Sequence, residues 1–280
     1  MQQTFQEIQT LHSEDHKSDA LVEIIEAAAK LEHLEQTILL LQQSLQEVQI
    51  FQDDFNKSDV LISMISTVAN LGQSEQTIRL LQQALQEIQT LQNGFSKSDA
   101  LISVASLYVG LGQSEQALAL LQQALQVAQI LQNNPTVLSH IASVYISLKQ
   151  PEQAIPLLQK ALQVVPNYRD GLDISSGFRD VVLSMTDLRQ SEQAVPLLRQ
   201  ALQTVQTIQG SSHGLNDITQ AAAALSDTDW SQMLLDETLQ VARRENASFP
   251  LRTLAVLYAK QWRWDRSLAA LRRCGESLRG

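Results

Sequence analysis

Nearly identical segments recur along the chain at a fixed spacing. The segment GQSEQTIRLLQQALQ, from Gly72 to Gln86, returns forty residues later as GQSEQALALLQQALQ, from Gly112 to Gln126. A second motif, KSDALV, begins at Lys17 and returns as KSDVLI at Lys57 and KSDALI at Lys97. The glutamate of the first motif recurs at Glu35, Glu75, Glu115, Glu152 and Glu192. Such a period predicts an array of similar units, each packed on its neighbours.

Each repeat unit is predicted to consist of two helices joined by a short turn. In the third unit we expect an A helix over 98–111 and a B helix over 114–132. Ser98 is the expected N-cap of the A helix, and Ser114 that of the B helix. Gly112 offers the left-handed residue that commonly ends a helix. Glycine and proline are scarce, at 10 and 6 of 280 residues, so helix should prevail throughout.

The B helix of the third unit carries a narrow apolar stripe. Leu121, Ala124 and Leu125 share one side, while Glu115 and Gln122 lie opposite. Neither helix can bury its stripe alone, so stacked neighbours must cover it. A long coiled coil is the competing architecture, because the segments are heptad-like. It is disfavoured because the stripe breaks at a Gly, Asn or Ser turn after about twenty residues.

The spacing of large, small and aromatic residues resembles that of the tetratricopeptide repeat. The positions that carry the resemblance in the third unit are Leu101, Ala105, Tyr108, Gly112, Ala117 and Ala124. The fourth unit repeats the pattern with Leu138, Ala142, Tyr145, Ala154 and Ala161. The resemblance implies an all-α, right-handed α-solenoid of about thirteen helices. The period of 37 to 40 residues exceeds the family's usual 34, and resembles a bacterial type, with cyanobacteria as one candidate source.

We expect one solenoid over residues 1–280. A capping B-type helix occupies 1–16, because MQQTFQEIQTL aligns with the second half of a B helix that begins at Leu81. This opening is either a natural cap or the cut end of a longer array. The expected repeats are 17–56, 57–96, 97–134, 135–170, 171–210, 211–247 and 248–280. The sixth repeat is degraded, since DITQAAAALSDTDW lacks the aromatic residue and the turn glycine.

The charge is unevenly placed along the chain. Residues 240–280 hold nine Lys or Arg against three Asp or Glu, whereas residues 1–239 hold eleven against 27. The acidic body should repel nucleic acid and anionic membranes. The basic C-terminal end, with Arg263, Arg266, Arg272 and Arg273, is expected to dock an acidic protein surface. It also favours weak head-to-tail homo-association.

Cysteine usage and the N-terminus indicate a soluble, cytoplasmic protein. Cys274 is the single cysteine, so no internal disulfide is possible. The N-terminal residues show no apolar core of signal-peptide length. No apolar run approaches the ~20 residues needed to span a bilayer.

The chain has no recognisable enzyme signature. It contains no glycine-rich phosphate loop, no HExxH and no CxxC, so we expect no catalytic residue, cofactor or metal. Cys274 is interpreted as a packing residue. His12 and His16 have a spacing that can bind a metal on a helix, but a solvated turn is the favoured interpretation.

The resemblance places the binding surface on the A helices, which line a concave groove in the family. Carried over position by position, the groove includes Glu23, Glu26, Lys30, Ser63, Ser66, Asn70, Ile102, Ser103, Ser106, Ser139, His140, Ser143, Arg179, Asp180, Asn216 and Arg252. These side chains are rich in serine and lack the basic set of the family's peptide-carboxylate clamps. The alternative is that they are only solvated helix faces.

The resemblance implies a non-catalytic protein–protein interaction scaffold or adaptor that binds a peptide or protein partner in this groove. The alternative is a sensor or regulatory repeat arm of a larger signalling protein, such as an ATPase or a protease.

Overall fold

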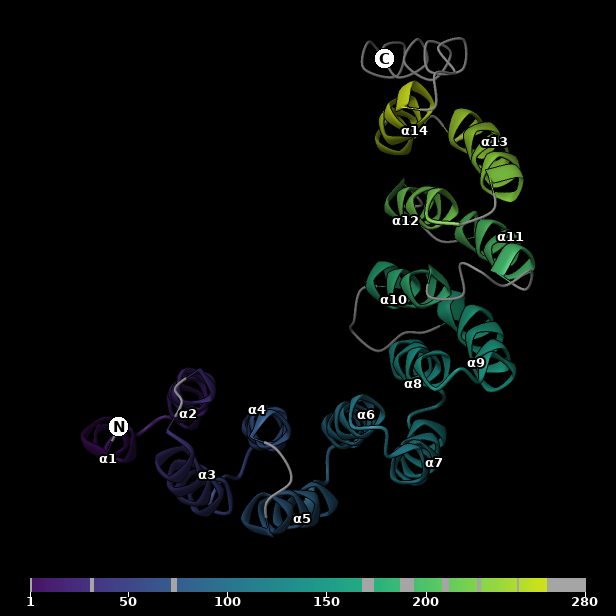
Figure 1. Ribbon diagram of the computed structural model, residues 1–280. Coiled ribbons are helices and arrows are strands. Elements are labelled where there is room, and N and C mark those ends of the chain that lie inside the picture. The colour runs from purple at the N-terminus through teal and green to yellow at the C-terminus, as the bar shows by residue number, and fades with distance from the viewer. Residues whose placement is uncertain are drawn as a thin grey trace. The chain divides into compact units, whose positions relative to one another are not determined.

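The fold is built from helices in tandem (Figure 1). The computed structural model describes residues 2–30, 33–71, 75–167, 174–186, 194–207, 212–225, 228–245 and 247–260. These residues form fourteen α-helices and one short 3-10 helix, with no strand among them. The all-α class is therefore confirmed.

The chain divides into two compact units, Met1–Gln132 and Asn133–Gly280. The helices of the first unit are α1 (Gln2–Gln9), α2 (Glu14–Ala29), α3 (Leu34–Val48), α4 (Asp54–Asn70), α5 (Glu75–Thr90), α6 (Gly94–Gly110) and α7 (Ser114–Ile130). Those of the second unit are α8 (Pro135–Ser147), α9 (Pro151–Val164), η1 (Val165–Asn167), α10 (Ile174–Thr186), α11 (Ala194–Val205), α12 (Ser212–Ala223), α13 (Thr228–Arg244) and α14 (Ser248–Lys260).

Within each unit the A helices form one row and the B helices another. In the first unit α2 packs on α4 and α4 on α6, while α3 packs on α5 (Figure 1). In the second unit α8, α10, α12 and α14 pack in sequence, and so do α9, α11 and α13. This is the tandem stacking that the repeat period predicts.

The core is aliphatic and contains the residues that carry the repeat pattern. Leu101, Ala105, Ala117 and Ala124 are fully buried, and Tyr108 is 9% exposed. The equivalent residues of the fourth repeat, from Leu138 to Ala161, are buried as well. Alanine at these positions lets neighbouring helices approach closely, which fills the space between the rows without large side chains.

The A helix of the third repeat begins about one turn earlier than the sequence suggested. Helix α6 starts at Gly94, and its N-cap is Asn93, whose side chain accepts hydrogen bonds from Phe95 N (2.9 Å) and Ser96 N (3.1 Å). Asp53 and Asn134 cap α4 and α8 in the same way. The prediction that Ser98 is the N-cap is wrong: Ser98 is fully buried, and its hydroxyl donates to the Phe95 carbonyl.

The turn between the two helices of the third repeat follows the prediction more closely. Gly112 has a φ of +72°, the left-handed conformation expected of it. The next amide, of Gln113, donates to the Tyr108 carbonyl at 2.8 Å and closes the end of α6. Ser114 is the first residue of α7 rather than its cap. The cap position belongs to Gln113, whose side chain makes no capping hydrogen bond.

A carboxylate from one A helix holds the start of the next. Glu14 accepts from the amides of Gln52 (3.0 Å) and Asp53 (3.0 Å). Asp54 accepts from the amides of Gln92 (2.6 Å) and Asn93 (2.5 Å). These amides precede a helix and have no partner inside it, so the carboxylate satisfies them and sets the register between repeats.

Gly94 stands where Glu14 and Asp54 stand in the earlier repeats. A Cβ atom at Gly94 would lie 3.0 Å from Leu131 Cδ2, which is tighter than ordinary van der Waals contact. A side chain at position 94 would therefore require the Leu131 side chain to shift by a few tenths of an ångström.

The degraded sixth repeat still forms a helix pair, α12 and α13. Leu215, Ile218 and Ala222 of α12 are fully buried, so small and aliphatic side chains replace the missing aromatic residue. The B helix expected in the seventh repeat lies outside the described residues. So do Arg263, Arg266, Arg272 and Arg273 of the basic C-terminal end, as well as Cys274.

Candidate groove on helices α2, α4 and α6

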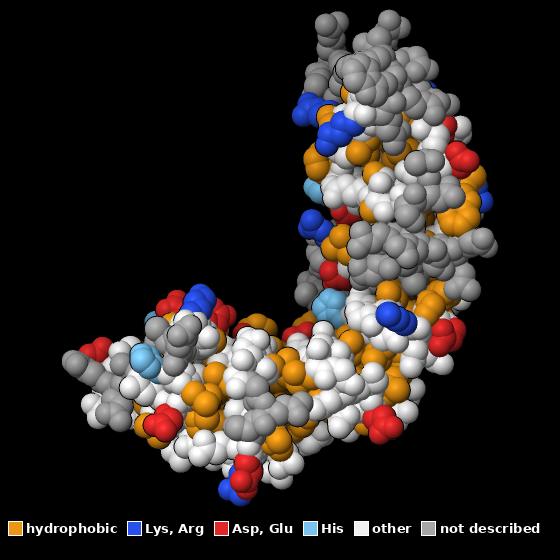
Figure 2. Space-filling model, viewed as in Figure 1, with side chains coloured by type: hydrophobic (Ala, Val, Ile, Leu, Met, Phe, Trp, Pro, Cys, Tyr) orange, Lys and Arg blue, Asp and Glu red, His pale blue; other side chains and the backbone are white. Residues whose placement is uncertain are grey.

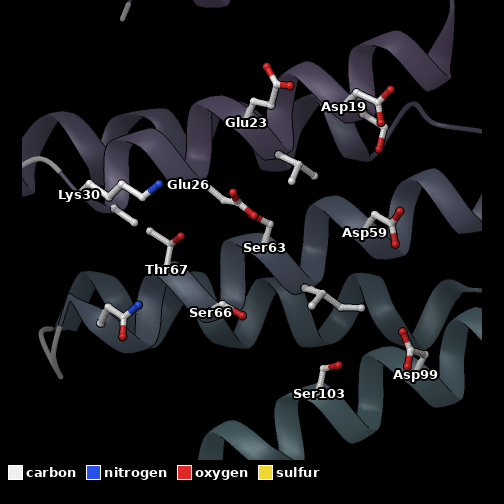
Figure 3. Close-up of a pocket in the computed structure, with 15 residues that line it drawn as sticks. Asp19, Glu23, Glu26, Lys30, Asp59, Ser63, Ser66, Thr67, Asp99 and Ser103 are labelled. Atoms are coloured by element: carbon white, nitrogen blue, oxygen red, sulfur yellow. The ribbon is translucent and has the colours of Figure 1, made fainter. Parts of the chain in front are cut away.

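A groove of about 810 Å³ crosses the A helices α2, α4 and α6 of the first unit (Figure 3). Three successive repeats contribute to it, because their A helices lie side by side and present the same positions. Its lining residues are Ser18, Asp19, Val22, Glu23, Glu26, Ala29, Lys30, Asp59, Ile62, Ser63, Ser66, Thr67, Asn70, Asp99 and Ser103.

The structure brings together seven of the residues predicted to face a groove. They are Glu23, Glu26, Lys30, Ser63, Ser66, Asn70 and Ser103. Ser106 is exposed on α6 but does not line this groove.

Three of the predicted groove residues are buried instead of exposed. Ile102 is 6% exposed, Ser139 is fully buried and Asn216 is 4% exposed. Ser139 donates to the Thr136 carbonyl (2.8 Å), and Asn216 Oδ1 accepts from Thr253 Oγ1 (2.6 Å). Packing against neighbouring helices of the same unit buries these side chains and leaves a narrower exposed stripe than the repeat pattern suggests.

The other predicted residues of the second unit make contacts within it. The Ser143 hydroxyl donates to Ser184 Oγ at 2.9 Å, which links α8 to α10. Arg179 is exposed, and its Nε lies 3.9 Å from Asp217 Oδ1 on α12. His140 and Asp180 are half-buried, and Arg252 is exposed. None of these residues lines the groove on α2, α4 and α6.

Burial and nearby charges shift the pKa of Asp217 in opposite directions. Burial raises its pKa above the ordinary value, whereas the positive charges of Arg179 and His213 act to lower it. Burial is the larger effect. The His213 ring also lies 5.7 Å from that of Phe249, in a tilted arrangement.

The groove carries a column of aspartates that sequence reasoning missed. Asp19, Asp59 and Asp99 all line it, one from each A helix, and they lie one above another in Figure 3. We call these three residues the aspartate ladder. The signal was present in the sequence, because each is the third residue of the recurring KSD motif.

The groove is acidic. Five of its lining side chains are carboxylates, and Lys30 is the single cation among them. Acidic side chains are also visible over the edge of this unit that carries α2 and α4 (Figure 2). The remaining polar lining consists of hydroxyls and one amide, which can donate as well as accept hydrogen bonds.

Asp59, the middle rung of the ladder, has a raised pKa. Partial burial is the largest cause, and the charges of Asp99, Asp19 and Asp53 add to it. The folded chain therefore binds this proton more tightly than the unfolded chain does. The free energy of unfolding then falls as the pH rises from the ordinary pKa of 3.8 through the raised pKa of the folded state. At neutral pH the ionised Asp59 carboxylate therefore destabilises the fold by its full amount.

We expect the Asp59→Asn variant to be more stable than the wild type at pH 7, by up to about 0.5 kcal/mol, because the site is partly exposed. The gain should disappear below pH 3.8, where the wild-type carboxyl is protonated in both states. Urea unfolding at both pH values measures it. A variant that is less stable than the wild type at pH 7 would show that the Asp59 carboxylate is favourable to the fold.

Ser63 is an unsatisfied group on the groove wall. Its hydroxyl oxygen is shielded from solvent and has no hydrogen-bond partner within the described part of the chain. Ser66, one turn further along α4, is exposed.

The described residues hold no group of three or more His, Cys, Asp or Glu side chains placed to bind a metal ion. His12 lies just before α2 and His16 in its first turn, and both are exposed. Among the described helices, none is long and apolar enough to cross a membrane.

Residues 108–172 match the family model described as tetratricopeptide repeat. The matched segment contains the end of α6 and the whole of α7, α8 and α9. This part of the chain therefore contains tetratricopeptide repeats. Repeats of this family generally bind proteins or peptides and are generally non-catalytic. A search of the curated proteins finds no match.

Several solved structures resemble the chain at low sequence identity. BtubC (BKLC) from P. vanneervenii is 16% identical, with a TM-score of 0.41, over 88% of this chain and 91% of that one. A Rap protein complexed with competence and sporulation factor is 13% identical, with a TM-score of 0.43, over 98% and 78%. A STAND protein with a tetratricopeptide repeat sensor from Pyrococcus horikoshii is 17% identical, with a TM-score of 0.40, over 91% and 41%. The family assignment rests on the repeat pattern and the family match.

Proposed function

We propose that the chain is a non-catalytic scaffold that binds an extended peptide segment of a partner protein in the groove on α2, α4 and α6. The observation that carries the proposal is the convergence of seven predicted groove residues on one hollow. Short side chains such as Ser63, Ser66 and Ser103 leave room for a peptide backbone, and the Ser66 and Ser103 hydroxyls can bond to it. Catalysis is not part of the proposal, since repeats of this family are generally non-catalytic.

A steric block of the groove tests this proposal. We expect the double variant Ser66→Tyr/Ser103→Tyr to lose peptide binding, because both residues line the groove and tyrosine fills it without a change of charge. Peptides selected from a random display library on the full-length chain provide the ligands. Their affinities for the wild type and the variant are then compared.

The matched control is Gln86→Tyr, which adds the same ring at an exposed position of the B helix α5. It should bind the selected peptides like the wild type. Both variants should stay folded, and Gln86→Tyr should keep its free energy of unfolding within about 0.5 kcal/mol, as exposed substitutions usually do. Selected peptides that bind the blocked variant as tightly as the control would place the binding surface elsewhere.

A further inference from the structure

We infer that a second hollow, between the second and third repeats, binds a small neutral molecule that has an apolar body and a hydrogen-bond acceptor. Helices α4, α5 and α6 and the start of α7 line this hollow, whose volume is about 330 Å³. We call it the inter-repeat pocket. It shares no lining residue with the groove on α2, α4 and α6, so the inference goes beyond the proposed function.

The apolar wall of the pocket is formed by side chains of α5 that are buried in the preceding repeat. Ile78 is 45% exposed, whereas Ile38, at the same position forty residues earlier, is 6% exposed. Leu81 is half-buried, whereas the equivalent Leu41 is fully buried. Both Ile78 and Leu81 line the pocket. In the row of B helices α3 packs on α5, but α5 and α7 make little contact, which leaves this wall uncovered.

Tyr108 lines the same pocket and provides a hydrogen-bond donor. The residue is 9% exposed, and its hydroxyl forms no hydrogen bond in the part of the chain that the structure describes. Burial raises the pKa of this hydroxyl, so it stays protonated and can donate. Buried polar groups normally have a hydrogen-bond partner, because a missing partner costs free energy. An acceptor atom of a ligand in the pocket supplies the partner that the fold does not.

The tyrosine distinguishes this pocket from the preceding repeat interface. The residues at the position of Tyr108 in the first and second repeats are Ala28 and Val68, which have no polar side-chain atom. The uncovered apolar wall and the hydroxyl therefore occur together where the second repeat meets the third, but not where the first meets the second. We expect the ligand to bind at this one interface of the first unit.

The lining of the pocket favours a neutral ligand of small size. None of the described residues that line it is charged, so a charged ligand would lose its hydration there without an opposite charge. Gln82, Gln113 and Gln116 contribute side-chain amides, which both donate and accept hydrogen bonds. The volume lies at the lower end of the range of about 300–1,000 Å³ that is usual for small-molecule sites. A molecule with one ring and one acceptor therefore suits the pocket.

Three probes of similar size test the inference by NMR titration of the isotope-labelled full-length chain. Acetophenone carries an acceptor oxygen, α-methylstyrene has a methylene group in place of that oxygen, and benzoate is charged. We expect acetophenone to bind with a Kd on the order of 1 mM, as is common for a ligand of so few atoms. Its chemical-shift changes should be concentrated in α4, α5, α6 and α7. Benzoate should not bind, because the pocket offers no positive charge.

Two variants separate the hydroxyl from the apolar wall. Tyr108→Phe should weaken acetophenone about fivefold, as expected for the loss of one neutral hydrogen bond, and leave the affinity for α-methylstyrene unchanged. Gln82→Trp should weaken both probes, because its ring occupies part of the pocket. The matched control is Gln42→Trp, which adds the same ring at the equivalent exposed position of the first repeat, outside the pocket. This control should bind both probes like the wild type.

Failure of acetophenone to bind the wild type would overturn the inference, and so would binding of benzoate with equal affinity. Equal affinities of Gln82→Trp and Gln42→Trp for acetophenone would also overturn it, since the probe would then bind elsewhere. If Tyr108→Phe weakens both neutral probes alike, the hydroxyl does not select an acceptor and the inferred ligand chemistry is wrong. None of these outcomes bears on the proposed function, because Ser66→Tyr/Ser103→Tyr tests the other groove with peptides.

Discussion

We expect the free energy of unfolding to fall by about 3 kcal/mol when Leu101 is replaced by alanine, within the usual range for such a core substitution. Leu101 is fully buried in α6, which packs on both α4 and α7. Its side chain therefore contributes to the contacts of two repeats, and its loss leaves a cavity that the helices close only in part. Equilibrium unfolding in urea measures the change.

The helices that lose hydrogen-exchange protection in this variant also test the stacking of the repeats. In a stacked array each repeat contacts only its neighbours, so hydrogen exchange of the Leu101→Ala variant should lose protection most in α6, α7 and α4, and least in α1. The control is Ile130→Ala on α7, where the side chain is 80% exposed and the cost should stay within about 0.5 kcal/mol. Equal loss of protection from α1 to α7 would contradict nearest-neighbour stacking.

Most of the fold could be predicted because each repeat is an independent copy of the same pattern. Positions such as Ala117, Ala124 and Gly112 recur in register, so chance similarity is excluded and their packing or turn role follows. All three behave in the structure as the repeat pattern predicts.

The helix starts could not be predicted, because two caps satisfied the local rules. Ser98 and Asn93 are both good N-cap residues. What favours Asn93 is a contact from outside the segment: the Asp54 carboxylate binds the amides of Gln92 and Asn93 and so fixes where the next helix begins. A pattern read along one segment does not contain that contact.

The error in the helix start also concealed the aspartate ladder. With a helix from Ser98, Asp99 belongs to the first turn, where a carboxylate is explained by the helix dipole. With a helix from Gly94, the same residue lies more than one turn inside and faces the groove. The small polar residues of the groove were found because their assignment depended only on the repeat register.

The lysine of the KSD motif pairs with the B helix of its own repeat. Lys57 Nζ lies 2.9 Å from Glu87 Oε2 and donates to Thr90 Oγ1 at 3.0 Å. In the first repeat Lys17 and Glu47 are 3.9 Å apart. In the third, Val127 occupies the glutamate position, and Lys97 donates to the Gln89 carbonyl instead. The lysine–glutamate distance is therefore short in the second repeat and longer in the first, and in the third repeat a hydrogen bond to a backbone carbonyl replaces the ion pair.

We expect Glu87→Leu to lower the free energy of unfolding by about 2–3 kcal/mol, slightly below the range for a fully buried pair that loses one partner. The Lys57 side chain is 10% exposed and that of Glu87 is 17% exposed, so the variant leaves a largely buried ammonium with only Thr90 as its partner. The double variant Lys57→Met/Glu87→Leu should recover most of the loss, because it removes the uncompensated charge and keeps the volume.

The first repeat supplies the matched control for this prediction. Glu47 accepts a hydrogen bond from Gln9, as Glu87 does from Gln49, but its lysine lies 1.0 Å farther away. Glu47→Leu should therefore cost clearly less than Glu87→Leu in the same urea unfolding experiment. If the double variant is as unstable as Glu87→Leu alone, the loss comes from the packing of the leucine. If both glutamate variants lower the free energy of unfolding by the same amount, the distance between the charges does not decide the stability.

A large loss of stability in Glu87→Leu that the double variant relieves would instead show that the KSD lysine is held inside the array by its glutamate. Its aspartate would then be the part of the motif left to face the groove.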